Sequence, residues 1–87
     1  MSMNKLEGRQ ELLVITMEEC GELIQECSKA LRKQDLFEQQ NLKDEIGDVY
    51  AMINLLVEYD VVSWTDLEER VKHKKNKLKQ WSDLVWL

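Results

Sequence analysis

Proline is absent from the 87 residues of this chain, and only three residues are glycine. These two residue types are the strongest helix breakers and the commonest residues of tight turns. A chain that has so few of them favours long helices and carries little of the turn chemistry that a sheet requires. Hydrophobic residues make up 44% of the chain, enough for a folded core. We therefore predict an all-α protein with a single domain over residues 1–87.

The positions of the helices follow from caps and from apolar spacing. The first helix is predicted from about Lys5 to Lys33, with cations in its last turns. Asn41 is the predicted cap of a second helix, which continues to about Tyr59. A third helix reaches at least Trp81, and its capping box is formed either by Ser63 with Asp66 or by Thr65 with Glu68.

The third helix carries an apolar stripe suited to packing on a neighbouring helix. The stripe consists of Trp64, Leu67, Val71, Leu78, Trp81 and Val85. A monomer of this size buries only about 60% of the surface that its unfolded chain exposes. The predicted architecture is therefore an antiparallel helical bundle that is completed by oligomerisation.

Two pairs of acidic residues lie where the helices should be apolar. Glu19 and Glu22, and then Glu45 and Asp48, are each spaced i,i+3. At about 100° per residue they project into or beside apolar arcs, and Glu26 falls in the first arc as well. Ionised carboxylates in such a setting need a cation or a proton, because burial and mutual repulsion both disfavour their charge. The pattern indicates a divalent metal site.

The donor set narrows the choice of metal. Oxygen-only ligands suit Mg²⁺ or Mn²⁺ and suit zinc or copper poorly. A di-iron bundle would need Glu-x-x-His pairs, whereas the only histidine, His73, follows Glu69 by four residues. An EF-hand would need a twelve-residue loop of alternating acids, which the sequence lacks.

Charge is distributed unevenly along the chain, whose net charge is −5. Residues 1–69 carry 16 acids and 6 bases, and residues 70–87 carry 6 bases and 1 acid. An acidic body argues against binding a nucleic acid polymer. The basic segment is either a solvated face paired with acids of a neighbouring helix or a site for phosphate oxygens near the metal.

The sequence predicts a cytoplasmic protein that does not enter the membrane. Its longest apolar run, Val49 to Val57, is interrupted by Asn54 and is too short to span a bilayer. Cys20 and Cys27 are seven residues apart on one helix, about 10 Å, which is too far for a disulfide. We expect both cysteines to be small core residues.

The pattern Glu-Glu-x-x-Glu over residues 18–22, followed after 22 residues by Glu-x-x-Asp over residues 45–48, resembles the MazG-like all-α nucleoside triphosphate pyrophosphohydrolases. The segment Asn76-Lys77-Leu78-Lys79-Gln80-Trp81 is similar to a downstream pattern of the same family. The resemblance implies Mg²⁺-dependent hydrolysis between the α and β phosphates of a nucleotide, with Mn²⁺ as a possible substitute. The products would be a monophosphate and pyrophosphate.

The resemblance also implies roles for individual residues and an oligomeric state. The implied metal ligands are Glu19, Glu22, Glu45 and Asp48. Glu18 would support the ligands or act as a base for water, so Glu18 and Glu22 are the predicted catalytic residues. The candidates for phosphate contact are Lys72, Lys75, Asn76 and Lys79. A homodimer or a homotetramer is expected.

Three other functions stay open at this point. One is phosphoribosyl-ATP pyrophosphohydrolase activity within the same superfamily. The second is a noncatalytic helical oligomerisation module, in which the acids bind a metal only for stability. The third is an antitoxin-like helical partner, whose uneven charge would serve protein binding.

Overall fold

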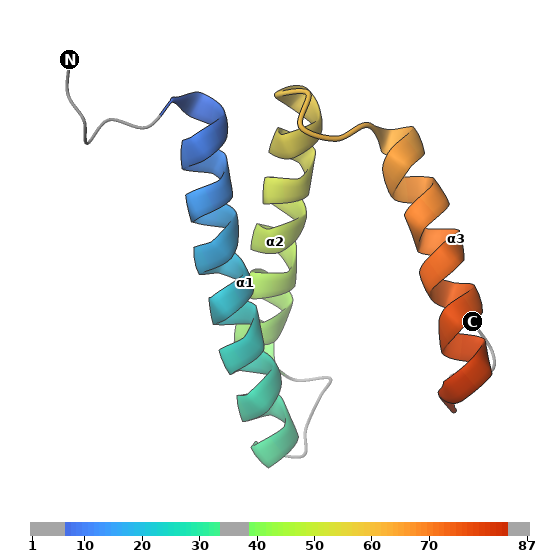
Figure 1. Cartoon of the computed structure of the whole chain (residues 1–87). Coiled ribbons are helices and arrows are strands. Elements are labelled where there is room, and N and C mark those ends of the chain that lie inside the picture. The colour runs from blue at the N-terminus through green and yellow to red at the C-terminus, as the bar shows by residue number, and fades with distance from the viewer. Residues whose placement is uncertain (1–6, 34–38, 84–87) are drawn as a thin grey trace.

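Three helices make up the computed structural model, which describes residues 7–33 and 39–83. They are α1 (Gly8–Lys33), α2 (Gln40–Glu58) and α3 (Trp64–Trp81). The described part of the chain contains no strand, which confirms the predicted all-α fold. As Figure 1 shows, α1 and α2 lie side by side and antiparallel, and α3 stands apart from this hairpin. The single domain over residues 1–87 and its completion by oligomerisation stay predictions.

A reciprocal cap fixes the start of α1. The backbone N–H of Gln10 donates to the Glu7 carboxylate at 3.0 Å, and the backbone N–H of Glu7 donates to Gln10 Oε1 at 3.1 Å. Side-chain oxygens thus replace the partners that the first N–H groups of a helix lack. The helix therefore begins at Gly8 rather than at the predicted Lys5, which lies outside the described residues. At its other end the described part of α1 extends to Lys33, the predicted last residue.

The core between α1 and α2 is small. The buried apolar residues of the described chain are Leu12 and Ala30 on α1 and Met52 on α2. At the open end of the hairpin, Arg9 Nε donates to the backbone oxygen of Tyr59 at 2.9 Å and so links the start of α1 to the end of α2. This hydrogen bond joins the N-terminal end of α1 to the C-terminal end of α2, the two ends that an antiparallel pair brings together.

The turn after α2 ends that helix in a specific way. Asp60 has a positive φ of 60°, its N–H donates to the Val57 oxygen, and the N–H of Val61 donates to the Leu56 oxygen. This pair of bonds is the Schellman arrangement, in which a left-handed residue satisfies the last carbonyl groups of a helix. Aspartate tolerates that conformation better than most residues because its short polar side chain bonds locally. The predicted end near Tyr59 is confirmed to within one residue.

The predicted capping box of α3 is confirmed for Ser63 with Asp66. Ser63 Oγ accepts from the Asp66 N–H at 3.1 Å, and Asp66 Oδ2 accepts from the Ser63 N–H at 3.2 Å. No residue of α3 is buried. Within the apolar stripe, Trp64 is 44% exposed and Trp81 is 65% exposed, and Val85 lies outside the described residues. One chain alone thus leaves the stripe incompletely covered.

Two expectations about individual residues are wrong. Asn41 lies inside α2, which begins at Gln40 after Gln39 and has no side-chain cap; Gln40 instead donates to Asp44 at 2.7 Å. Cys20 and Cys27 are both exposed, because the side of α1 that carries them is turned away from α2.

No helix in the described ranges combines the length and the hydropathy needed to cross a bilayer, and the cytoplasmic location stays a prediction.

Candidate metal centre

Three carboxylates meet where α1 packs against α2. Glu19 and Glu22 lie one turn apart on α1, and Glu45 reaches them from α2. One oxygen from each carboxylate can be chosen so that all three lie within 4.8 Å of one another. Helix packing brings these acids together because the i,i+3 pair on α1 and Glu45 on α2 both point toward the interface between the two helices. We call this group the acidic cluster.

Burial makes the acidic cluster costly when it is empty of cations. Glu45 is buried, with 8% of its surface exposed, Glu19 is half-buried and Glu22 is exposed. Glu19 Oε2 and Glu45 Oε1 are both buried and have no hydrogen-bond partner among the described residues. A buried carboxylate oxygen without a donor is strongly disfavoured. These two oxygens need a cation or a proton.

The electrostatics agree with this requirement. A hydrogen bond shared with the Glu19 carboxyl group, then burial, then the negative charges of Glu19 and Glu22 raise the pKa of Glu45 from 4.5 to about 8. Two ionised carboxylates cannot donate to each other, so only a proton held between them can form that bond. Without a metal, Glu45 is therefore largely protonated at neutral pH.

The other acids of the two motifs lie outside this group. Asp48, predicted as the fourth ligand, follows Glu45 by one turn of α2 and is exposed, and Glu18 is also exposed. Glu26, which the motifs left unexplained, forms an ion pair with Lys29 on the same helix, with 3.3 Å between Glu26 Oε2 and Lys29 Nζ. Its charge is thus offset without a metal, as is usual for an i,i+3 pair on a helix surface.

The donor set fits a hard divalent cation. All ligand atoms of the acidic cluster are carboxylate oxygens, the preferred donors for Mg²⁺ and Mn²⁺. The exposed Glu22 leaves one side of the cluster open to solvent. A cation there would keep positions for water or for phosphate oxygens, as Mg²⁺ commonly does in proteins.

The predicted phosphate contacts are on α3, away from the acidic cluster. Lys72, Lys75, Asn76 and Lys79 are all exposed. Among the described residues, no hydrogen bond or ion pair joins any of these four to the acidic cluster. One chain thus assembles the acids but leaves the cations separate from them.

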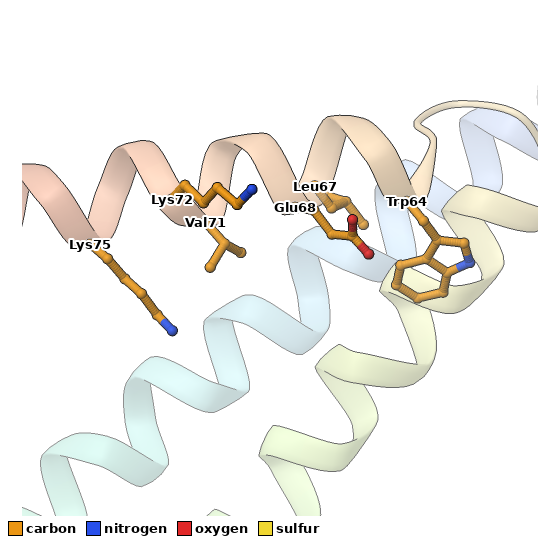
Figure 2. Close-up of a pocket in the computed structure, with 6 residues that line it drawn as sticks. All are labelled: Trp64, Leu67, Glu68, Val71, Lys72 and Lys75. Carbon is orange, nitrogen blue, oxygen red and sulfur yellow. The ribbon is translucent and has the colours of Figure 1, made fainter.

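Two of the four residues line a groove along α3. The groove has a volume of about 520 Å³, and its walls also include Trp64, Leu67, Glu68 and Val71. Figure 2 shows Trp64, Val71 and Lys75 extending from α3 toward the α1–α2 hairpin. Glu68 is the acidic residue of this groove, and its position one turn before Lys72 is the sequence signal that places both on one side of α3.

These features define a class of protein: an all-α chain in which two antiparallel helices bring together three carboxylates that could hold a metal ion. The sequence model of a protein family, the MazG nucleotide pyrophosphohydrolase domain, matches residues 3–86 of the chain. The chain therefore belongs to this family. Comparison with curated proteins and with solved structures gave no significant match.

Proposed function

We propose that this protein hydrolyses nucleoside triphosphates, with ribose or deoxyribose, at the bond between the α and β phosphates. Water adds to phosphorus, the bond to the bridging oxygen breaks, and a nucleoside monophosphate and pyrophosphate are released. Support comes from membership of a nucleotide pyrophosphohydrolase family. The observation that carries the proposal is the acidic cluster, with its two buried oxygens that lack partners.

In this proposal Glu19, Glu22 and Glu45 hold Mg²⁺, and Asp48 is the fourth ligand. Asp48 lies one turn after Glu45 on α2, so the two side chains project toward neighbouring positions on the helix surface. Mg²⁺, when bound, supplies positive charge that offsets the charge developing on the phosphates and on the pyrophosphate leaving group. Mn²⁺ has the same preference for oxygen ligands and should substitute.

Glu18 and Glu22 are the proposed catalytic residues. Both are exposed on α1, so solvent water can reach them. An exposed carboxylate can accept a hydrogen bond from the attacking water, which orients the water and helps remove its proton. Glu45 is unsuited to this role because it is buried.

Lys72, Lys75, Asn76 and Lys79 are the proposed phosphate contacts. The three lysine ammonium groups can donate charge-assisted hydrogen bonds to phosphate oxygens, and the amide N–H groups of Asn76 can donate neutral ones. This role requires α3 to bring them to an acidic cluster, either in the same chain or in a second copy. A homodimer or homotetramer is accordingly part of the proposal.

The test is a product analysis on the purified protein. A panel of ribo- and deoxyribonucleoside triphosphates, together with phosphoribosyl-ATP, is incubated with Mg²⁺ and followed by phosphorus NMR. Monophosphate and pyrophosphate should appear for at least one triphosphate. Phosphoribosyl-ATP as the only substrate would select the alternative of a phosphoribosyl-ATP pyrophosphohydrolase. If no compound of the panel is hydrolysed, a noncatalytic module becomes the better description.

A variant pair ties any activity to the acidic cluster. Glu45→Gln keeps the size of the side chain and removes the charge that a cation needs, so turnover should fall at least about 100-fold. Glu58→Gln makes the same change at an exposed position on the same helix and should retain turnover. Equal activity in the two variants would contradict the ligand assignment.

A further inference from the structure

The groove along α3 holds an acidic side chain next to two of the proposed phosphate contacts. Glu68 lies one turn after Trp64 and one turn before Lys72, and Lys75 lies at the far end of the same groove. A carboxylate that faced the phosphates of a nucleotide would repel them. The presence of Glu68 therefore calls for a different contact with the ligand. We call the groove drawn in Figure 2 the α3 groove.

The polar and aromatic side chains of the α3 groove follow a chemical order along one side of the helix. At 100° per residue, Glu68, Lys72 and Lys75 lie within about 80° of Trp64 around the helix axis. Figure 2 shows them in the order Trp64, Glu68, Lys72 and Lys75 along α3, over about 17 Å at 1.5 Å per residue. The order is thus an aromatic ring, then a carboxylate, then two ammonium groups.

The Glu68 carboxylate is available to a ligand. Its side chain is exposed, and no hydrogen bond or ion pair joins it to another residue of the described ranges. Lys72 follows at the i,i+4 spacing at which glutamate and lysine commonly pair on a helix, yet these two do not pair here. An ionised carboxylate can only accept hydrogen bonds. A group that binds Glu68 must therefore donate, as a hydroxyl group does.

We propose that the α3 groove binds a ribonucleotide, with the base against Trp64, the ribose hydroxyl groups donating to Glu68, and the phosphates on Lys72 and Lys75. The order of the side chains matches the order of base, sugar and phosphate in such a ligand. Aromatic rings stack on every kind of base, and an acidic side chain is a common partner of a ribose hydroxyl group. The inference rests on the proposed function and narrows its substrates to those that contain ribose.

The lining of the α3 groove suits the base end of this ligand. Leu67 and Val71 form apolar walls beside Trp64, which is 44% exposed and so has ring surface left to cover. The groove volume of about 520 Å³ is within the usual range of small-molecule sites, which are mostly apolar with a few polar groups that fix orientation. Glu68, Lys72 and Lys75 are the polar groups here.

The direction of the nucleotide in the α3 groove agrees with the position of the acidic cluster along the molecule. The helices α2 and α3 run in opposite directions from the turn between them, as Figure 1 shows. Glu45 lies 13 residues before Glu58, the end of α2, and Lys75 lies 11 residues after Trp64, the start of α3. These spacings correspond to about 20 Å and about 17 Å. The phosphate end of the groove and the acidic cluster are thus at similar distances from the turn.

Binding is tested with the full-length chain by isothermal titration calorimetry in Mg²⁺. The ligands are triphosphate analogues with an imido group between the α and β phosphates, which blocks hydrolysis there. Adenine, guanine, cytosine and uracil are each tested as the ribose and the 2′-deoxyribose form. For every base that binds, the ribose form should bind at least about tenfold more tightly, as expected for a hydrogen bond to a charged group. No binding of any analogue, or equal binding of the two sugar forms, would overturn the proposal.

A matched pair of variants assigns the sugar preference to Glu68. Glu68→Ala should bring the ratio of the two affinities close to one, chiefly by weakening the ribose form. Glu69→Ala removes the same charge from the next, exposed position, about 100° around the helix, and should keep the ratio of the natural chain. Neither change removes a core contact, because α3 has no buried residue. A ratio that persists in Glu68→Ala, or a change in base preference with the sugar ratio unchanged, would overturn the role of Glu68.

A third variant separates the contact with the base from the contact with the sugar. Trp64→Leu keeps an apolar side chain but removes the aromatic ring, so it should weaken the ribose and deoxyribose forms alike by about tenfold, the usual effect of one lost stacking contact. The ratio of the two affinities should stay that of the natural chain. Unchanged affinities in Trp64→Leu would overturn the placement of the base.

The binding data also separate this inference from the proposed function. Triphosphates that are hydrolysed, together with analogues that bind equally well in both sugar forms, would overturn the ribose contact and leave the hydrolysis intact. Analogues that bind with the Glu68-dependent preference, together with triphosphates that stay intact, would support the ribonucleotide site and contradict the hydrolysis.

Discussion

Glu19 and Glu45 meet across the α1–α2 interface, and each presents a buried carboxyl oxygen that lacks a hydrogen-bond partner among the described residues. Folding the chain therefore forces two like charges together unless a proton or a cation intervenes. The same contact that closes the hairpin therefore creates a need for a proton or a cation. If the acidic cluster binds Mg²⁺ as proposed, stability and cation binding are coupled through this pair of side chains.

Removing the charge of Glu45 should separate these two effects. Glu45→Gln is expected to raise the melting temperature of the metal-free protein above pH 8, because it removes a repelling carboxylate. It should also abolish the stabilisation by Mg²⁺, which for the natural chain amounts to about 2.7 kcal/mol at 100 times the dissociation constant. Thermal melts with EDTA and with Mg²⁺ measure both, and Glu58→Gln should respond to Mg²⁺ like the natural chain.

The raised pKa of Glu45 predicts a pH dependence of the metal-free protein. The group titrates near 4.5 when unfolded and at about 8 when folded, so the folded state holds the extra proton between these values. Its contribution to the free energy of unfolding is complete below pH 4.5 and is lost as the pH rises through 8. Urea unfolding in EDTA from pH 5 to 9 should show this decline in the natural chain relative to Glu45→Gln. Parallel curves for the two proteins would contradict it.

The proposed phosphate contacts predict a substrate effect confined to particular lysines. Lys75→Ala should raise KM for a triphosphate about tenfold or more, since a charge-assisted hydrogen bond to phosphate contributes roughly 1.5–3 kcal/mol. Lys77→Ala removes the same charge from the same helix at a position outside the proposed set. Steady-state kinetics at constant ionic strength compare the two. A similar KM change in both would point to general charge attraction rather than contact.

The small core predicts a strong effect at Leu12. This residue is 8% exposed and belongs to the few buried apolar side chains of the hairpin. Leu12→Ala should lower the free energy of unfolding by about 2–5 kcal/mol, as usual for a truncated core leucine. Val61→Ala, at a position 44% exposed, should cost much less. Equal losses in chemical denaturation would show that Leu12 is not part of the core.

The capping box predicts local rather than global destabilisation. Ser63→Ala removes the acceptor for the Asp66 N–H and should cost about 1 kcal/mol. Because α3 has no buried residue, the loss should appear as faster amide hydrogen exchange in its first turn. Thr65→Ala, the alternative cap in the sequence, should leave that exchange nearly unchanged. Faster exchange after Thr65→Ala alone would contradict the assignment.

Much of the fold was readable because local chemistry determines it. The C-terminal end of α2 and the Ser63–Asp66 box follow from spacing and caps that lie within a few residues. The meeting of Glu19, Glu22 and Glu45 was also predictable, because all three project into or beside apolar arcs that pack together. The same reasoning also included Asp48, which is exposed and lies outside this group. Membership of the family confirms the predicted resemblance.

The features that sequence reasoning missed depend on contacts between helices. Asn41 is a good cap by type, but the cap position is Gln39, two residues earlier, and it makes no side-chain cap hydrogen bond. Cys20 and Cys27 share the spacing of core residues, yet a helix with two adjacent apolar stripes can bury only one against a single neighbour. Residues close in sequence determine neither where α2 starts nor which stripe of α1 is buried.

Because α3 is sparsely packed, the backbone angles of the short turn before it determine where its far end lies. Eighteen residues of helix extend about 27 Å, so a rotation of roughly 10° at the turn moves the far end by about 5 Å. Asp60, with its left-handed backbone, lies at this pivot. Small changes in two or three backbone angles there would set how far the lysines of α3 stand from the carboxylates of α1 and α2.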